Sequence, residues 1–453
     1  MDRRNDSGEG ALLKHREMSP TVRFALPVMA ENLLTMATVQ VTHMLIGRIS
    51  GASLAASGMG NTVITFTNAA FTMINTGTAV LISRLVGARE ENEAADTLEQ
   101  SISLLTLSAV VVALLFLAAA RPILGLLMPT AEAALMGEAL IYFRIMALSF
   151  PFLMLESLLS GALRASGNSR AAMHLGVCMN VLLAIFAAIF IPLCHLGIVG
   201  AGLSYLLARV AGAALAAVIV VRFHGRFMIR LKNVLHPRLS AWKRIFRVGA
   251  PMSLEQISVQ GGYLIANAMT VGLGTLSATV YQVCSSINDL TWSPNGVCSA
   301  TAQAMVGIRL GEGRVDEAKR VARRVWLAGA IAVTAIGLLM ALLGRTAASL
   351  YSADDMVLDM ARPILWLSVF TAIPGMSINA IDATLRVGGD AKYVMIVSMI
   401  GVWLIRLPLT WLLAYHMQLG VIGVFLANGA SLTFRMVLGL IRFARGNWIH
   451  KSI

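Results

Sequence analysis

The chain has 453 residues, of which 57% are hydrophobic and only 13% are charged, and its formal net charge is +13. A soluble protein of this length needs more charged side chains to cover its surface, so the composition excludes an ordinary soluble globular fold. The basic excess does not indicate nucleic-acid binding, because it lies in short segments between long apolar runs. The four cysteines form no CxxC pair, which excludes a disulfide framework and a zinc site.

Apolar runs of about 18 to 20 residues, the length that crosses a bilayer, recur along the whole chain. The first 23 residues are polar and mixed in charge, so no cleavable signal peptide is expected before the first run. We therefore predict an all-α polytopic membrane protein with twelve transmembrane helices. The predicted spans, in chain order, are 22–46, 52–82, 98–118, 134–159, 170–192, 198–221, 244–269, 276–303, 324–343, 358–384, 393–415 and 420–441.

The distribution of lysine and arginine predicts the orientation of these spans. If the N terminus lies inside, the inner segments hold 28 Lys and Arg residues and the outer loops hold four. Basic residues are concentrated on the cytoplasmic side of membrane proteins. We therefore predict a multi-pass protein of the plasma (inner) membrane with both termini in the cytoplasm.

A basic segment lies halfway along the chain, at residues 222–247. It carries eight basic residues and no acid, interleaved with Phe, Ile, Leu and Trp. Such a segment is attracted to anionic headgroups, so we expect it to lie at the cytoplasmic surface in contact with membrane lipids. Nucleic-acid binding is the alternative interpretation of the same charges, and the membrane setting disfavours it.

The chain repeats itself with an offset of 220 to 224 residues. Leu163-Arg164 matches Leu385-Arg386, and Glu31 matches Glu255. Each copy holds six spans, so both copies have the same orientation, which is typical of transporters that bind substrate between two rocking lobes. The predicted organisation is an N-terminal tail (1–21), an N-lobe (22–221), a linker (222–243), a C-lobe (244–445) and a C-terminal tail (446–453).

Polar residues recur at helical spacing on one face of spans 1, 2, 7 and 8. They are Glu31, Thr35, Thr38 and Thr42 on span 1; Asn61, Thr65, Asn68, Thr72 and Asn75 on span 2; Gln256, Gln260, Tyr263 and Asn267 on span 7, beside Glu255; and Gln282, Ser285, Asp289, Ser293 and Gly296 on span 8. Because spans 1 and 2 correspond to spans 7 and 8 in the repeat, we predict that all four stripes face a water-accessible cleft. Hydroxyls and amides also hold neighbouring helices together, which is the alternative for any single Ser or Thr.

Five carboxylates are predicted inside spans, where an uncompensated charge is costly. They are Glu31, Glu156, Glu255, Asp289 and Asp382. Asp289 lies near the middle of span 8, so it is the first candidate for the coupling site, and Glu255 is the second. Asp382 precedes Arg386 by one turn, which favours an interfacial ion pair between them. Arg209 and Arg435, inside spans 6 and 12, are candidate partners for the buried acids.

Prolines mark predicted hinges in three spans. Pro151 and Pro374 are repeat mates in spans 4 and 10, and Pro294 lies in span 8. Each ring removes a backbone hydrogen bond and favours bending at that point.

The order of short motifs along the chain supports a resemblance to a known family. The motifs LPVMAEN, GRISGASLAASG, GTAVLISRLVGARE and GALRASGNSRAAM, followed by GAPMSLEQ, TAQAMVGIRLGEGRVDEA and LRVGGDAKYVM, resemble those of bacterial multidrug and toxic compound extrusion (MATE) transporters of the MOP flippase superfamily. The resemblance covers nearly all of residues 20–445. It implies two six-helix lobes in a V shape and export of organic cations or other amphipathic toxic compounds. It also implies antiport driven by an inward gradient of protons or sodium.

This chain departs from the family at the positions of its ion-binding carboxylates. The span 1 acid of many relatives corresponds to Thr42, the span 7 acid to Val259, the span 8 acid to Gln282 and the span 10 acid to Gly375. Because these acids are displaced, we expect protons rather than sodium as the coupling ion. Sodium held at Glu255 or Asp289 is the alternative, and no cofactor is expected.

A lipid-linked saccharide flippase of the same superfamily is the alternative function, and twelve spans with acidic stripes disfavour it. No cluster of metal ligands, nucleophile elbow or phosphate-binding loop occurs in the spans, so we do not expect an enzyme. The expected partners are small-molecule drugs or organic cations, and the expected functional unit is a monomer.

Overall fold

The computed structural model describes residues 20–47, 49, 51–127, 133–223, 231–234, 236–349, 354–446 and 448. The predicted N-terminal tail lies almost wholly outside these residues, as do much of the predicted linker and most of the C-terminal tail.

The first half of the chain forms a six-span lobe, the N-lobe. Its helices are α1 (Pro20–Gly47), α2 (Gly51–Gly87), α3 (Glu91–Leu127), α4 (Ala133–Ala165), α5 (Ser169–Ala188) with the π-helical segment η1 (Ile189–Leu193), and α6 (Gly197–Phe223). Helix α4 lies at its centre and packs against α2, α3 and α6. Phe143 and Phe150 of α4 are fully buried there.

The second half forms the C-lobe after the short helix α7 (Leu231–Val234). Its helices are α8 (Leu239–Gly272), α9 (Thr275–Thr291), α10 (Ser293–Gly311), α11 (Val315–Leu342), α12 (Gly344–Ser349), α13 (Asp355–Val387), α14 (Ala391–Met399), η2 (Ile400–Arg406), α15 (Leu407–Trp411), η3 (Leu412–His416) and α16 (Gly420–Arg445). Helix α13 is central and packs against α10, α11 and α16. It therefore occupies the place in the C-lobe that α4, its repeat mate, occupies in the N-lobe.

The all-helical fold with twelve spans is confirmed. Ten segments of the described chain are by themselves long and apolar enough to cross a membrane. The other two spans are α8 and the pair α9–α10. Helix α8 carries many polar residues, and the predicted span 276–303 is divided at Trp292 into α9 and α10. The two spans that are least apolar are thus the two C-lobe spans for which polar stripes were predicted.

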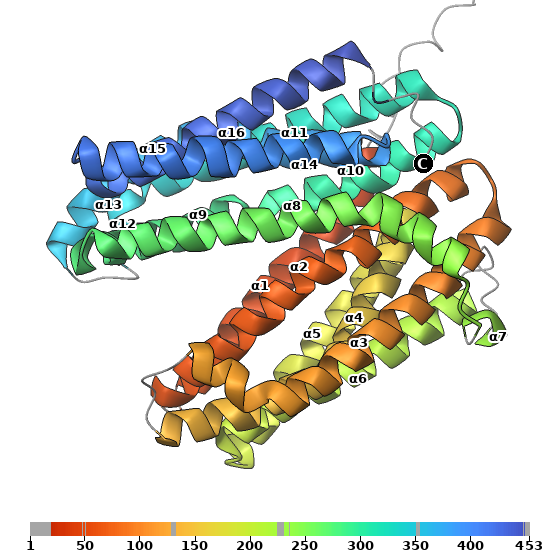
Figure 1. The fold of residues 1–453 in the computed structure, drawn as a ribbon, viewed down its shortest axis with the longest axis horizontal. Coiled ribbons are helices and arrows are strands. Elements are labelled where there is room, and N and C mark those ends of the chain that lie inside the picture. The colour runs from red at the N-terminus through yellow and green to blue at the C-terminus, as the bar shows by residue number, and fades with distance from the viewer. Residues whose placement is uncertain are drawn as a thin grey trace, which may run out of the picture.

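The two lobes lie side by side and form a V (Figure 1). They approach each other at the end that holds α7, which we call the linker end, and they diverge toward the opposite end, which we call the open end. Helix α2 of the N-lobe makes most of the contact, against α8 and α10 of the C-lobe.

Glycines allow the close approach of the lobes at the linker end. A Cβ at Gly77 of α2 would lie 3.2 Å from the Cα of Gly249 in α8, and a Cβ at Gly249 would collide with the carbonyl of Met73. Ser253 of α8 also donates a hydrogen bond to the carbonyl of Ala70, at 2.8 Å. Small residues let helix backbones meet, so this seam depends on the absence of side chains.

Helix α3 anchors the linker to the N-lobe. The buried Gln100 amide donates to the carbonyls of Asn233 (3.1 Å) and His236 (3.2 Å), and its oxygen accepts from the N–H of Arg238 at 2.8 Å. Its neighbour Glu99 accepts from the side chain of Asn233 at 2.8 Å. The predicted contact of the linker with lipid stays a prediction, because residues 224–230 are outside the described chain.

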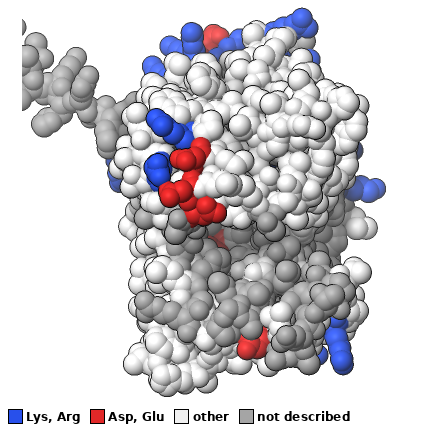
Figure 2. Space-filling view, turned by 90° about the vertical axis from the view of Figure 1, so that its left-hand side faces the viewer, with Lys and Arg blue, Asp and Glu red and all other residues white. Residues whose placement is uncertain are grey.

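The surface at the open end is mostly uncharged where the structure describes it, with one group of acidic and basic side chains on the C-lobe half (Figure 2). At this end Arg345 pairs with Asp355 at 2.7 Å and with Asp359 at 3.6 Å. A scarcity of basic residues is expected of an outer face. The orientation itself stays a prediction.

Candidate functional site

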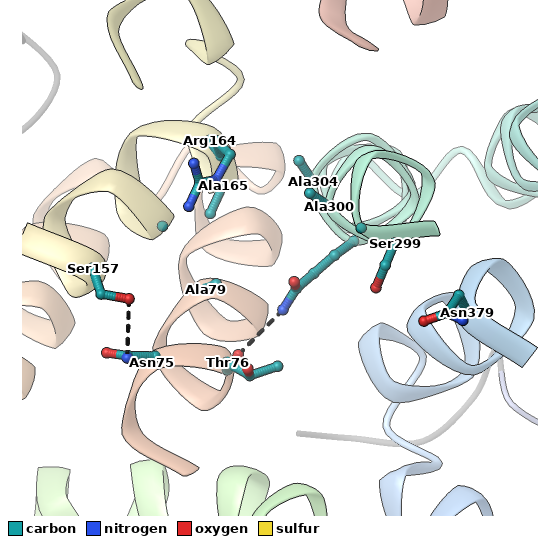
Figure 3. A pocket seen from close by; sticks show the side chains of 13 residues that line it. Asn75, Thr76, Ala79, Ser157, Arg164, Ala165, Ser299, Ala300, Ala304 and Asn379 are labelled. Carbon is teal, nitrogen blue, oxygen red and sulfur yellow. Dashed lines mark hydrogen bonds between the residues drawn. The ribbon is translucent and has the colours of Figure 1, made fainter. Parts of the chain in front are cut away.

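A polar cavity of about 330 Å³ lies between the lobes. It is lined from the N-lobe by Asn75, Thr76, Ala79, Ser157, Gly161, Arg164 and Ala165, and from the C-lobe by Gly296, Ser299, Ala300, Gln303, Ala304 and Asn379. Its walls come from α2, α4, α10 and α13 (Figure 3). The two central helices of the lobes thus face the same space, and Ser157 and Asn379, repeat mates in those helices, both line it.

Amides and hydroxyls dominate the lining. Asn75 donates to the Ser157 hydroxyl at 3.3 Å, while its own side-chain oxygen is buried without a hydrogen bond. Across the boundary, the Gln303 amide donates to the carbonyl of Thr76 at 3.3 Å (Figure 3). The cavity therefore offers both donors and acceptors to a bound molecule, and it is bridged by a hydrogen bond between the lobes.

Arg164 supplies the only charged side chain of this lining. One of its terminal nitrogens donates to both oxygens of Glu31 on α1, at 2.9 and 3.1 Å. Gly176 of α5 makes room for this pair, because a Cβ there would lie 2.6 Å from the Glu31 side chain. Arg164 therefore places a guanidinium group at the cavity, and Glu31 largely neutralises its charge.

The C-lobe holds the equivalent pair, made by the repeat mates of those residues. Arg386 of α13 donates to both oxygens of Glu255 on α8, each at 2.8 Å. The Ser398 hydroxyl donates to Glu255 at 2.8 Å and accepts from Arg435 of α16 at 2.7 Å. Glu255 is only 4% exposed. The duplication thus produced an α1–α4 pair and its counterpart between α8 and α13.

Each lobe has a second buried pair, between its fourth and sixth spans. In the N-lobe, Arg209 of α6 pairs with Glu156 of α4 at 2.7 Å. In the C-lobe, Arg435 of α16 lies 3.6 Å from Asp382 of α13. Both C-lobe residues stand 226 positions after their counterparts, one helical turn beyond the offset of the repeat. This turn brings Arg435 to 3.6 Å from Glu255, so the two C-lobe pairs merge into one cluster.

Two expectations for the embedded acids were wrong. Glu255 does not face a cleft, because it is buried between Arg386 and Arg435. Asp382 does not form an interfacial pair with Arg386; it is buried and lies against Arg435, while Arg386 turns to Glu255. Burial beside two guanidinium groups also makes Glu255 a poor sodium ligand, because the site already holds two positive charges. In the described residues no group of three metal-ligating side chains is present.

Asp289, the first candidate, has a different environment. It is exposed on α9, and no ion pair or hydrogen bond to its side chain is present in the described residues. Arg435, the partner considered for it, is engaged by Asp382 and Glu255 instead. Helix α9 lies on the side of the C-lobe that is turned toward the N-lobe (Figure 1). Asp289 is thus a mid-span carboxylate without an internal partner.

The remaining stripe residues divide into buried and exposed groups. Exposed or half-buried are Asn61, Thr65, Asn68, Thr72, Gln256, Gln260, Tyr263, Asn267, Gln282, Ser285, Ser293 and Gly296. On α1 the expectation fails for Thr38, which is buried and donates to the carbonyl of Leu34 at 2.9 Å. Thr35 and Thr42 donate to carbonyls of their own helix in the same way. Thr65 and Thr72 of α2 do the same, and Thr35 and Thr42 are half-buried, so Thr38 is the one buried hydroxyl among the described residues of the four stripes.

The predicted hinge prolines lie in two kinds of place. Pro151 and Pro374 are inside the continuous helices α4 and α13. Pro294 lies in the first turn of α10, next to the break at Trp292. Of the three prolines, Pro294 is the one beside a division between two α-helices, at a position where its missing N–H removes no helical hydrogen bond. Whether these sites act as hinges stays a prediction.

The sequence did not single out Arg164, Ser157, Gln303 or Asn379 as lining residues. The signal that could have found three of them was present, since Ser157 with Asn379 and Arg164 with Arg386 are repeat mates at an offset of 222. Gln303 lines the cavity from α10, and the sequence did not predict the break that separates α10 from α9.

Comparison with known proteins assigns both halves of the chain to one family. The sequence profile of the MatE family matches residues 27–190 and 251–412, once in each lobe. An uncharacterized transporter, YisQ of Bacillus subtilis, is 26% identical over 94% of this chain and 94% of its own length. A probable multidrug resistance protein, NorM of Thermotoga maritima, is 23% identical and covers 95% of this chain and 93% of its own.

Solved structures show the same fold. A MOP superfamily transporter from Pyrococcus furiosus superposes with a TM-score of 0.87 at 20% identity, covering 96% of each chain. A multidrug resistance MATE family transporter, described in an outward-facing conformation, gives a TM-score of 0.87 at 20% identity over 94% of this chain and 96% of that one.

Proposed function

Because the chain belongs to the MatE family, we propose that it is a secondary active multidrug efflux transporter that exports organic cations or other amphipathic compounds. Export would be driven by exchange for protons or sodium, with the two lobes alternating access to the cavity between them. The relatives named as probable multidrug resistance proteins support this assignment.

The observation that carries the proposal is the position of the polar cavity where two pseudo-symmetric lobes meet. Its volume of about 330 Å³ is that of a small-molecule site. The lobes are joined at the linker end through glycine seams and a few hydrogen bonds, and they diverge at the other end. Such an interface can open and close as rigid lobes rock, which is the mode of access in transporters built from parallel repeats.

In the predicted orientation, the linker end is cytoplasmic. The seam between α2 and α8 would then close the cavity to the cytoplasm, and the diverging ends would face outward. A cysteine pair that joins the open ends of α2 and α9 should stop transport when it is crosslinked. Full transport by the crosslinked protein would contradict rocking lobes.

Asp289 is the proposed coupling carboxylate. It is exposed, in the middle of a span and without an internal partner, so its charge must be compensated by an ion, by water or by a cationic substrate. Glu31, Glu156, Glu255 and Asp382 are all engaged by arginine. A proton and a cationic drug that compete for one carboxylate have coupled fluxes, and for this reason we favour protons over sodium.

The variant Asp289→Asn tests this assignment. We expect it to fold and to insert normally, and to lose gradient-driven efflux of a fluorescent organic cation by at least tenfold, the loss that corresponds to about 1.4 kcal/mol. Ser286→Ala on the same helix is the matched control and should keep most of the activity, because the Ser286 hydroxyl donates to the carbonyl of Gln282 in its own helix. Collapsing the pH and sodium gradients separately identifies the ion. Normal efflux by Asp289→Asn would refute the coupling role.

A lipid-linked saccharide flippase is the second candidate, and one observation favours it. Amides, hydroxyls and Arg164 supply the polar part of the cavity lining, and no acid is among the described residues that line it. Such a lining suits a hydroxyl-rich or phosphorylated molecule as well as a drug. The small volume and the neutralisation of Arg164 by Glu31 favour the exporter. Direct binding of a fluorescent cation and of a lipid-linked sugar to purified protein separates the two.

A further inference from the structure

One arginine inside the C-lobe, Arg406, has no partner of opposite charge among the described residues. Arg406, at the end of η2, lies in the middle of the span Ala391–His416 and is only 2% exposed. In the described residues it forms no ion pair and no hydrogen bond, and its Nε is buried and unsatisfied. A guanidinium group stays protonated in proteins, so this charge cannot be removed by loss of a proton. A buried charge inside a membrane span requires a compensating group.

The groups near Arg406 do not provide that compensation. Its guanidinium carbon lies 3.9 Å from the centre of the Tyr263 ring, which covers one face by a cation–π contact. An aromatic ring compensates only part of a desolvated charge. Two turns earlier in the same span, Ser398 belongs to the C-lobe cluster in which Glu255 and Asp382 face Arg386 and Arg435. The charges of that cluster already balance one another.

A buried hydroxyl lies one turn from the arginine. Thr410 is fully buried, and its Oγ1 has no hydrogen bond in the described structure. Other span threonines donate to the carbonyl four residues earlier, as Thr270 does at 2.8 Å and Thr301 at 2.7 Å. Thr410 makes no such bond to the carbonyl of Arg406, which lies four residues earlier at the end of the π-helical turn η2. Its hydroxyl is therefore free to bind something else.

This arrangement is present in one lobe only. At the repeat offset of 222, Arg406 corresponds to Ala184 and Thr410 to Ala188. The corresponding part of α5 is a continuous α-helix, and π-helical turns often mark functional sites. Neither the shared fold nor the symmetry of the lobes accounts for a buried arginine and an unsatisfied hydroxyl at this place.

We propose that Arg406 and Thr410 bind a small monatomic anion such as chloride inside the C-lobe, beside Tyr263. Both unsatisfied groups can donate, since Arg406 offers N–H groups and the Thr410 hydroxyl an O–H, and a positive charge beside donors one turn apart on the same helix favours an anion. The burial of both side chains leaves no opening for a phospholipid headgroup or a drug. A water molecule would satisfy the hydrogen bonds but would leave the charge uncompensated.

Thermal unfolding of the purified protein in detergent tests the proposal. We expect the Tm to rise saturably when chloride or bromide replaces gluconate at constant sodium and ionic strength, because an ion that binds only the folded state stabilises it. Thr410→Val should weaken the apparent halide affinity about tenfold, the effect of one hydrogen bond to a charged partner. Arg406→Gln should abolish the halide response.

The matched control is Thr301→Val, a buried threonine with an ordinary bond to its own helix, which should leave the halide response unchanged. A crystal grown in bromide should show an anomalous peak within hydrogen-bond distance of Arg406 and Thr410. Equal Tm values in chloride and gluconate, a response that persists in Arg406→Gln, or stabilisation by carboxylates alone would each overturn the proposal. None of these readouts depends on drug transport.

Discussion

The N-lobe and the C-lobe carry the same two buried ion pairs and connect them differently. In the N-lobe, Arg164 belongs to Glu31 and Arg209 to Glu156, and among the described residues no ion pair links the two. In the C-lobe, Arg435 reaches both Glu255 and Asp382. A displacement of one helical turn along α13 and α16 is enough to join two separate pairs into a cluster.

The consequence is a difference in what each lobe presents to the cavity. The N-lobe pair stays separate, and its arginine lines the cavity opposite α10 and α13. The C-lobe arginines are drawn into the cluster, and Asn379 is the residue that α13 contributes to the cavity. Duplication supplied the same scaffold twice. A shift of one turn joined the ion pairs of the C-lobe and left the N-lobe with a charged group at the cavity.

The largest expected effect comes from removing the arginine that joins the C-lobe pairs. Arg435→Met leaves Asp382 without its ion-pair partner and removes the hydrogen bond to Ser398. Loss of one member of a buried ion pair destabilises a protein by about 3–5 kcal/mol, and we expect the upper part of that range here. The free energy of unfolding of the purified protein, or its Tm, measures the loss.

The matched N-lobe variant is Arg209→Met, which leaves Glu156 unpaired and removes a hydrogen bond to Tyr205. It should cost less, because Arg209 pairs with one acid and Arg435 lies against two. Adding Asp382→Asn to Arg435→Met should restore part of the stability, because it removes the stranded charge. Equal losses of stability in the two lobes would show that joining two ion pairs into a cluster does not make the shared arginine more important.

A double-mutant cycle gives the next largest difference. Glu255→Gln and Asp382→Asn share the partner Arg435, so their effects on the free energy of unfolding should deviate from additivity by about 0.5–3 kcal/mol. The corresponding N-lobe variants, Glu31→Gln and Glu156→Gln, share no partner. Their effects should add to within about 0.5 kcal/mol. Similar coupling in both lobes would show that the acids of the N-lobe also act as one unit.

The sequence predicted the fold well and the site incompletely, for identifiable reasons. Apolar runs and the repeat were sufficient for twelve spans and two lobes, because both depend on local composition. The partners of the embedded acids were not predictable, because Arg435 and Asp382 meet only when α16 packs on α13. The break at Trp292 also depends on tertiary packing, since the Trp292 ring lies against Gly375 of α13. Periodicity indicated which face of each helix is polar, but not which polar residue is buried by an arginine from another span.

The smallest expected effect concerns Ser398, the neutral member of the C-lobe cluster. Its hydroxyl donates to Glu255 and accepts from Arg435, so Ser398→Ala removes two charge-assisted hydrogen bonds while the ion pairs remain. We expect a loss of about 1–2 kcal/mol in the free energy of unfolding. The N-lobe mate of Ser398 is Gly176, where a Cβ would collide with Glu31, so the bridge has no counterpart there.

Ser204→Ala is the control for Ser398→Ala, because Ser204 is equally buried and donates only to the carbonyl of Gly200 in its own helix. Such a bond adds little to stability, so this variant should stay within about 0.5 kcal/mol of the wild type. If Ser398→Ala is equally silent, the arginine holds the cluster together alone. If its loss approaches that of Arg435→Met, the hydroxyl rather than the second guanidinium couples the two pairs. The geometry predicts an intermediate loss. Arg435 lies 3.6 Å from each of the two acids, whereas its hydrogen bond to Ser398 is short, at 2.7 Å, so both kinds of contact hold the cluster together.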